Sequence, residues 1–256
     1  MDNRQRIGFD PFITFKEDTH QYFGQDGFQY TPVSNVLRTF KESFDSAKVS
    51  LAMSGGDINA QQELLEQWND KREIASRYGN LIHKPMENFF RIGEIEPGFE
   101  SIIDDVSSIM QPYDKVFPEF QFYSKFHKIC GTSDIPFTRR TRRIEGTTYD
   151  ILDIGDYKTN ASNGIRYSSS YWKDGKWKHG NYMLGPLSHL EDCEYNVDAM
   201  QLSLYARMAE MEYLVIIGRL FILYIGLNGR VEHIPVPYLR YEADAVLNAY
   251  ASLKKI

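Results

Sequence analysis

Cysteine is scarce in this sequence: among 256 residues, only Cys130 and Cys193 occur. Two cysteines can build neither a disulfide framework nor a four-cysteine metal site. No apolar run is long enough to span a bilayer, and the first residues, MDNRQRIGFDPF, lack the apolar segment of a secretory signal. A G-x-x-x-x-G-K-S/T segment is also missing, so there is no helicase motif. These absences lead us to expect a soluble, cytoplasmic protein with no membrane association.

Basic residues are also fewer than acidic residues, and the formal net charge is −6. This balance argues against a protein that coats nucleic acid nonspecifically, although a local basic patch can still bind DNA. Two segments are basic, FTRRTRR at 137–143 and KDGKWKHG at 173–180. Either could contact phosphates, and Trp172 or Trp177 could stack on a base. A solvated loop explains each segment equally well.

The hydrophobic pattern predicts an α/β protein of one domain. In chain order it predicts strands at 12–23 and 28–33, helices at 57–90 and 99–110, and strands at 117–127, 129–138 and 148–159. A long polar segment at 161–194 follows, then a helix at 196–212, strands at 220–225 and 231–237, and a helix at 241–255. We expect residues 1–56 to form an N-terminal hairpin and helix extension packed on a core of residues 57–256. The core should contain a central mixed β-sheet flanked by helices.

The predicted strand at 148–159 ends in two opposite charges. Asp156 and Lys158 are two residues apart and therefore project from the same side of the strand, with Tyr157 on the other. For an arbitrary D-x-K, an ion pair at the edge of a sheet is an adequate explanation. Asp134, however, lies in the middle of the preceding predicted strand. If the two strands are neighbours, its carboxylate converges with this pair.

Two carboxylates that lie close together repel each other unless a cation lies between them. Carboxylate and main-chain carbonyl oxygens are the hard ligands that Mg²⁺ and Mn²⁺ prefer. A divalent ion with Lys158 beside it would position and activate a water against a phosphodiester and stabilise the developing charge. Asp134, Asp156 and Lys158 therefore predict metal-dependent phosphodiester hydrolysis.

The order of these motifs resembles the PD-(D/E)XK nuclease superfamily, with G-x-x-D, then a strand ending in D-x-K, then a helix with Q-x-x-x-Y. The matching segments are GTSD, DYK and QLSLY. The sequence is most similar to the branch of RecB-type nuclease domains, phage lambda-type exonucleases and the mitochondrial genome-maintenance exonuclease. Upstream, YGNLIHKPMENFF resembles that branch's helix with G-x-x-x-H and a following acid, and HQYFGQDGFQYTPVSNVL resembles the lead-in of phage members. The resemblance spans roughly residues 12–240 and implies a restriction-endonuclease-like core.

Carried over motif by motif, the resemblance implies a set of metal ligands. These are the side chains of His83, Asp134 and Asp156, joined by the main-chain carbonyl of Tyr157. Lys158 would be the catalytic lysine.

The resemblance also assigns three residues around these ligands. Gln201 and Tyr205 are four apart, share one helix face and would lie near the active site and the DNA. Glu119, in FPEF, matches an acid on the first core strand and would contact the metal through water or position the substrate. Asp153 is also acidic and nearby, but the D-x-K spacing selects Asp156.

The resemblance implies a deoxyribonuclease that depends on Mg²⁺ or Mn²⁺, and we expect an exonuclease that acts in DNA recombination, repair or processing. DNA is the expected substrate, while a homo-oligomer or a recombination or replication partner is left open. The phage-like lead-in indicates a phage origin, which would place the protein in the host cytoplasm.

The alternative is a catalytically impaired DNA-binding or assembly subunit that keeps the nuclease fold. Its motivation is the acidic net charge together with Pro85, which follows His83 by two residues inside the predicted helix. Proline there removes the hydrogen bond to Leu81 and should kink the helix. The helix would then restart near His83, or His83 would be displaced from the metal site.

Overall fold

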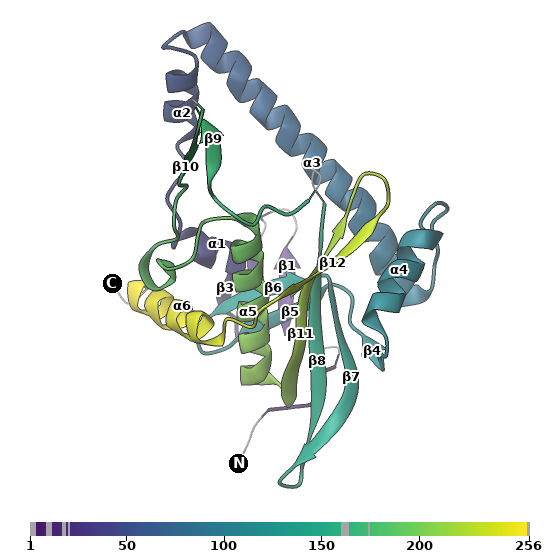
Figure 1. Cartoon of the computed structure of the whole chain (residues 1–256). Helices are drawn as coiled ribbons and strands as arrows, with labels where there is room; N and C mark the ends of the chain where they lie inside the picture. The colour runs from purple at the N-terminus through teal and green to yellow at the C-terminus, as the bar shows by residue number, and fades with distance from the viewer. Residues whose placement is uncertain are drawn as a thin grey trace.

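The computed structural model describes residues 4–8, 12–16, 19, 21–159, 164–173 and 175–254. His20 in the predicted lead-in, and residues 160–163 around the start of the predicted polar segment, lie outside these ranges. Within the described ranges the strands form two five-stranded sheets and one two-stranded hairpin (Figure 1). None of the helices described is both long and apolar enough to cross a membrane.

The first sheet is mixed and has the strand order β12-β11-β8-β7-β4. Its strands are β4 (Lys115–Val116), β7 (Ile135–Ile144), β8 (Thr147–Lys158), β11 (Val215–Ile225) and β12 (Val231–Val236). β8 pairs parallel with β11 and antiparallel with β7. With helices on both sides of this sheet (Figure 1), the predicted class, α/β with a central mixed sheet flanked by helices, is confirmed.

The described α-helices are α1 (Val33–Arg38), α2 (Ser46–Met53), α3 (Ile58–Ile92), α4 (Glu100–Met110), α5 (Glu194–Glu212) and α6 (Arg240–Leu253). Apolar side chains of α3 and α4 pack on one face of the first sheet, and those of α5 and α6 pack on the other. Leu152 and Ile154 of β8 pack in the apolar layer that includes α5 and α6, whereas Tyr157 packs in the layer that includes α3 and α4. Because side chains alternate along a strand, Asp156 and Lys158 project toward α5.

The second sheet has the order β1-β2-β3-β6-β5. Its strands are β1 (Ile13–Lys16), β2 (Gln21–Gly24), β3 (Gln29–Pro32), β5 (Phe120–Ser124) and β6 (Ile129–Ser133). β3 pairs parallel with β6, so the N-terminal strands share a sheet with strands of the predicted core. The division of the chain at residue 56 stays a prediction.

The single strand predicted at 129–138 is wrong. It is broken at Asp134 into β6, which belongs to the second sheet, and β7, which belongs to the first. Oδ2 of Asp134 accepts a hydrogen bond from the main-chain N–H of Tyr157 at 2.7 Å, and its carbonyl oxygen accepts one from the N–H of Glu119 at 3.0 Å. These long-range bonds hold the chain where it crosses between the sheets. Asp134 therefore lies at a crossing point and not in the middle of a strand.

The basic segment at 137–143 is not a loop, because β7 continues through it. The β7–β8 hairpin turns at Glu145 and Gly146, whose φ angles are 48° and 83°. Nε of Arg139 lies 2.9 Å from Oδ2 of the buried Asp153, so this arginine is engaged inside the protein. The other arginines of the segment are exposed.

The predicted restart of a helix near His83 is wrong, since α3 runs without a break from Ile58 to Ile92 through Pro85. Ile82 and Met86, on either side of the proline, are buried in the apolar layer that also contains Tyr157. This packing holds the helix together where proline removes one backbone hydrogen bond. Figure 1 shows the N-terminal half of α3 extending beyond the body of the protein.

The predicted polar segment at 161–194 contains regular structure. It includes β9 (Tyr171–Lys173) and β10 (Lys176–Lys178), which pair antiparallel, and a short 3₁₀-helix, η1 (Gly185–Leu187). The basic residues predicted at 173–180 therefore lie on a hairpin and its flank.

Candidate metal centre

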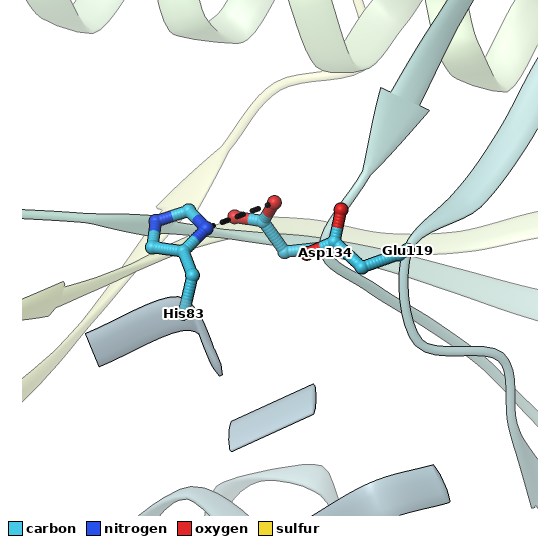
Figure 2. A group of neighbouring side chains, drawn as sticks. All are labelled: His83, Glu119 and Asp134. Carbon is cyan, nitrogen blue, oxygen red and sulfur yellow. Dashed lines mark ion pairs between the residues drawn. The ribbon is translucent and has the colours of Figure 1, made fainter. Parts of the chain in front are cut away.

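A histidine and two carboxylates meet where α3 passes the crossing between the sheets. The potential ligand atoms of His83, Glu119 and Asp134 all lie within 4.8 Å of one another. Nδ1 of His83 is 3.4 Å from Oδ1 of Asp134. Figure 2 shows the Asp134 carboxylate between the imidazole ring and Glu119. The structure thus brings two of the predicted ligands together with Glu119, for which the sequence had suggested a less direct role.

The backbone holds these side chains from segments that are distant in sequence. Glu119 directly precedes β5 and has a φ of 53°, in the left-handed region that few residues other than glycine adopt. Its N–H donates to the carbonyl of Asp134, and the Asp134 carboxylate accepts from the N–H of Tyr157. Backbone conformations of this kind cluster at functional sites, where the surrounding structure enforces them.

Asp156 lies beside this group but outside its closest three members. Its Oδ2 is 2.7 Å from Nζ of Lys158, at the end of β8. The hydrogen bond from Tyr157 to Asp134 brings the crossing point against this strand end. It stays a prediction that Asp156 and the Tyr157 carbonyl bind the metal and that Lys158 has a catalytic role.

Burial and mutual repulsion perturb the acids and the imidazole. Burial, with the charge of Asp134, raises the pKa of Glu119 to about 8. Burial and the same charge raise the pKa of Asp156 to about 7, against the opposing effect of Lys158. Burial by itself lowers the pKa of His83, but the hydrogen bond and charge of Asp134 outweigh it and raise the pKa to about 9. The carboxylates therefore resist ionising beside one another in the metal-free site, and a bound cation would relieve this.

A further acid, Asp198 of α5, contacts Lys158 and was not predicted from the sequence. Its Oδ1 is 3.4 Å from Nζ of Lys158, so the ammonium group lies between two carboxylates. Burial lowers the pKa of Lys158, but Asp156 and Asp198 outweigh this effect and raise it above its ordinary value. Asp198 precedes Gln201 by three residues and shares its helix face, a spacing that could have revealed it.

Gln201 and Tyr205 form a hydrogen-bonded pair on the same face of α5. Nε2 of Gln201 donates to the Tyr205 hydroxyl at 2.9 Å, and the Tyr205 ring is buried. A Cβ atom on Gly131 would lie 2.5 Å from that ring, so the glycine of GTSD gives Tyr205 its room. The pair borders the site from the α5 side, and a role of the pair in catalysis stays a prediction.

Tyr157 supports His83 from the opposite face of β8. The two rings meet edge to face, with centroids 5.6 Å apart. The Tyr157 hydroxyl is buried without a hydrogen-bond partner among the described residues. The contact therefore orients the imidazole by packing.

Asp153 is not a member of the metal cluster and pairs with arginines instead. It is fully buried, and its Oδ2 lies 2.9 Å from Nε of Arg139 and 2.5 Å from Nε of Arg219. Two guanidinium groups therefore compensate its charge. Its surroundings are those of a structural ion pair in the interior.

A cavity of about 990 Å³ opens at Glu119. Phe15 and Tyr22 from the N-terminal strands line it together with Arg91 and Lys115. Glu119 therefore borders a space that offers both aromatic and cationic side chains.

Comparisons with known proteins establish no family for this chain. No family model matches it. No curated protein matches its sequence. Among solved structures, it is similar to a "Putative exonuclease" from Eubacterium rectale, with 12% identity and a TM-score of 0.32, over 88% of this chain and 79% of that one. Similarity at this level does not establish a shared fold, and the site is therefore interpreted from its own geometry.

Proposed function

We propose that this protein is a metal-dependent nuclease that hydrolyses phosphodiester bonds in DNA. The observation that carries the proposal is the cluster of His83, Glu119 and Asp134 beside the Asp156–Lys158 pair. Carboxylate oxygens with one imidazole suit a hard or borderline divalent cation such as Mg²⁺ or Mn²⁺. The raised pKa values of Glu119 and Asp156 support this fit, because a bound cation would offset the burial and the repulsion that raise them.

Each residue has a chemical part in this proposal. His83, Asp134 and Glu119 would hold a divalent ion, with Asp156 and the Tyr157 carbonyl as further ligands. When bound, such an ion supplies Lewis acidity to a water and to the phosphate oxygens.

Lys158 would place its positive charge against the phosphate as negative charge develops there. Asp156 and Asp198 keep it protonated and limit the positions that its side chain can adopt.

The motif resemblance supports a finer version of the proposal. It assigns the chain to the PD-(D/E)XK superfamily, with residues 57–256 as a restriction-endonuclease-like core that acts as an exonuclease in recombination, repair or DNA processing. The phage-like lead-in extends this version to a phage protein that acts in the host cytoplasm.

The alternative, a catalytically impaired binding subunit, was motivated by the acidic net charge and by Pro85, and Pro85 no longer supports it. α3 passes through Pro85 intact, and His83 still reaches Asp134.

The test is cleavage of labelled single- and double-stranded DNA with Mg²⁺ or Mn²⁺. Lys158→Ala should lower the cleavage rate by a factor of about 10² or more, since it removes a preorganised charge at the phosphate, and should leave Mn²⁺ binding intact. Lys84→Ala is a matched control, because this lysine is exposed beside His83 and pairs with Glu87. Normal Mn²⁺ binding by a wild-type protein that cleaves neither DNA would refute catalysis and favour the binding subunit. Wild-type activity in Lys158→Ala would refute the part assigned to this lysine.

A further inference from the structure

The β9–β10 hairpin stands apart from the two main sheets. Tyr171–Lys173 pairs antiparallel with Lys176–Lys178, and no other described strand joins this pair. Figure 1 shows the hairpin projecting from the body of the protein, in the direction in which α3 also extends. None of its described residues belongs to the buried apolar core, so its composition does not follow from a need for burial.

The base of the hairpin is anchored although its tip is exposed. The hydroxyl groups of Ser168 and Ser169 donate to Oε2 of Glu191, at 2.7 and 3.1 Å, and the N–H of Ser169 donates to the same oxygen at 2.8 Å. On the other leg, a Cβ on Gly180 would lie 2.0 Å from the Ser169 carbonyl oxygen, so only glycine allows the two legs to pass this closely. The tip is therefore presented on a defined stem.

Two tryptophans occupy the exposed tip. Trp172 and Trp177 are directly opposite each other in the register, with ring centroids 5.6 Å apart and an interplanar angle of 79°. Their exposed fractions are 60% and 70%, although large aromatic side chains are usually well buried. Two rings that meet edge to face leave ring surface open to a third planar group.

The hairpin is basic in an acidic protein. Residues 171–180 contain three lysines and one aspartate, a net charge of +2, whereas the whole chain carries −6. Lys176 and Lys178 are exposed and flank Trp177, so they project from the opposite face of the ribbon. The ribbon is only two strands wide, so their long side chains can reach a chain of phosphates that passes along either edge.

We propose that the β9–β10 hairpin binds an unpaired nucleic-acid strand, with bases stacked on Trp172 and Trp177 and phosphates paired with Lys176 and Lys178. Exposed aromatic rings with interspersed lysines form the surface on which single strands stack. Paired bases in a duplex do not present their faces, and the positive charge favours a polyanion. In choosing DNA as the strand, the inference rests on the proposed function. The inference adds to the proposed function that the DNA substrate has an unpaired end, and that the β9–β10 hairpin binds this end.

The test uses the full-length protein in EDTA, so that binding is measured without cleavage. Fluorescein-labelled oligo(dT) and a blunt duplex of equal length are titrated, and anisotropy is recorded. The double variant Trp172→Ala/Trp177→Ala should bind oligo(dT) about thirtyfold or more weakly, as the loss of two stacked bases predicts. Trp172→Phe/Trp177→Phe should retain most of the affinity, and Lys176→Gln/Lys178→Gln should reduce its salt dependence.

Trp68→Phe is the matched control, because this third tryptophan lies on α3, packs against Phe44 and should not affect binding. Unchanged Mn²⁺ binding by the double variant shows that the protein is folded.

Wild-type affinity for oligo(dT) in the double alanine variant would overturn the proposal, as would a wild-type protein that binds no oligo(dT). A change of oligomeric state in that variant without a change in oligo(dT) affinity would also overturn it, and would assign the hairpin to a protein contact. Binding that depends on the tryptophans in a protein that cleaves no DNA would support the hairpin site and refute only the catalytic proposal.

Discussion

Metal binding at the cluster should release protons, because two of its ligands are protonated near neutral pH. The pKa of Glu119 is raised to about 8 and that of His83 to about 9. A metal ion needs the carboxylate ionised and the imidazole neutral, so both protons must leave when it binds. At pH 7 this gives about two protons released per ion, falling to less than about one at pH 9. Asp156, with a pKa of about 7, adds roughly half a proton at pH 7 if it also ligates.

The affinity for the ion must then rise with pH. Near pH 7 the binding constant should increase by about a hundredfold per pH unit, since each displaced proton contributes a factor of about ten. Titration calorimetry with Mn²⁺ in two buffers of different ionisation enthalpy counts these protons directly. His83→Gln is the control, because it should lower the count by about one. Equal heats in the two buffers, with an affinity that does not change between pH 6.5 and 8.5, would refute the proposed ligand set.

The same pKa shifts predict the stability of the metal-free protein. Both groups have folded-state pKa values above their ordinary values, 4.5 for Glu119 and 6.5 for His83. The folded chain therefore binds these protons more tightly than the unfolded chain does, and the free energy of unfolding should fall as pH rises from about 4.5 through about 9. Saturating Mn²⁺, at a hundred times its dissociation constant, should restore about 2.7 kcal/mol at high pH. Thermal unfolding with and without the ion measures both effects.

Three substitutions test other parts of the structure. Asp198→Asn should lower kcat about tenfold at unchanged Mn²⁺ affinity, because Lys158 loses one of its two carboxylate partners, and a wild-type kcat would contradict this. Asp153→Asn should lower the free energy of unfolding by about 1–3 kcal/mol in urea titrations, because two half-buried guanidinium groups lose their counter-charge. Gly155→Ala places a Cβ 2.6 Å from the Phe221 ring and should cost about 1–3 kcal/mol, and unchanged unfolding would show that the ring can move aside.

Some local structure was predictable because it depends on near neighbours in sequence. The alternation of β8 correctly placed Asp156 and Lys158 on one side and Tyr157 on the other. The hairpin of β9 and β10 also had a local signal, since an Asp-Gly pair between short aromatic segments favours a tight turn. The polar composition of the surrounding residues hides this signal within a long polar segment.

Other features were mispredicted because distant contacts override local pattern. The segment 129–138 has the composition of one strand, yet the hydrogen bond from Tyr157 to Asp134 holds the chain where it changes sheets. Pro85 should disturb a helix, yet the burial of Ile82 and Met86 in the apolar layer holds α3 through it. In both cases tertiary packing outweighs a local preference.

The sequence by itself determined the α/β class and the chemical types available for a site, because periodicity and residue identity are local properties. Only the tertiary structure decided that Glu119 joins His83 and Asp134, and that Asp198 shares Lys158 with Asp156. These groups come from α3, the segment before β5, the sheet crossing, β8 and α5. Their separations depend on how helices pack on sheets and where the chain passes between sheets, and neither is encoded in the spacing of residues along one element.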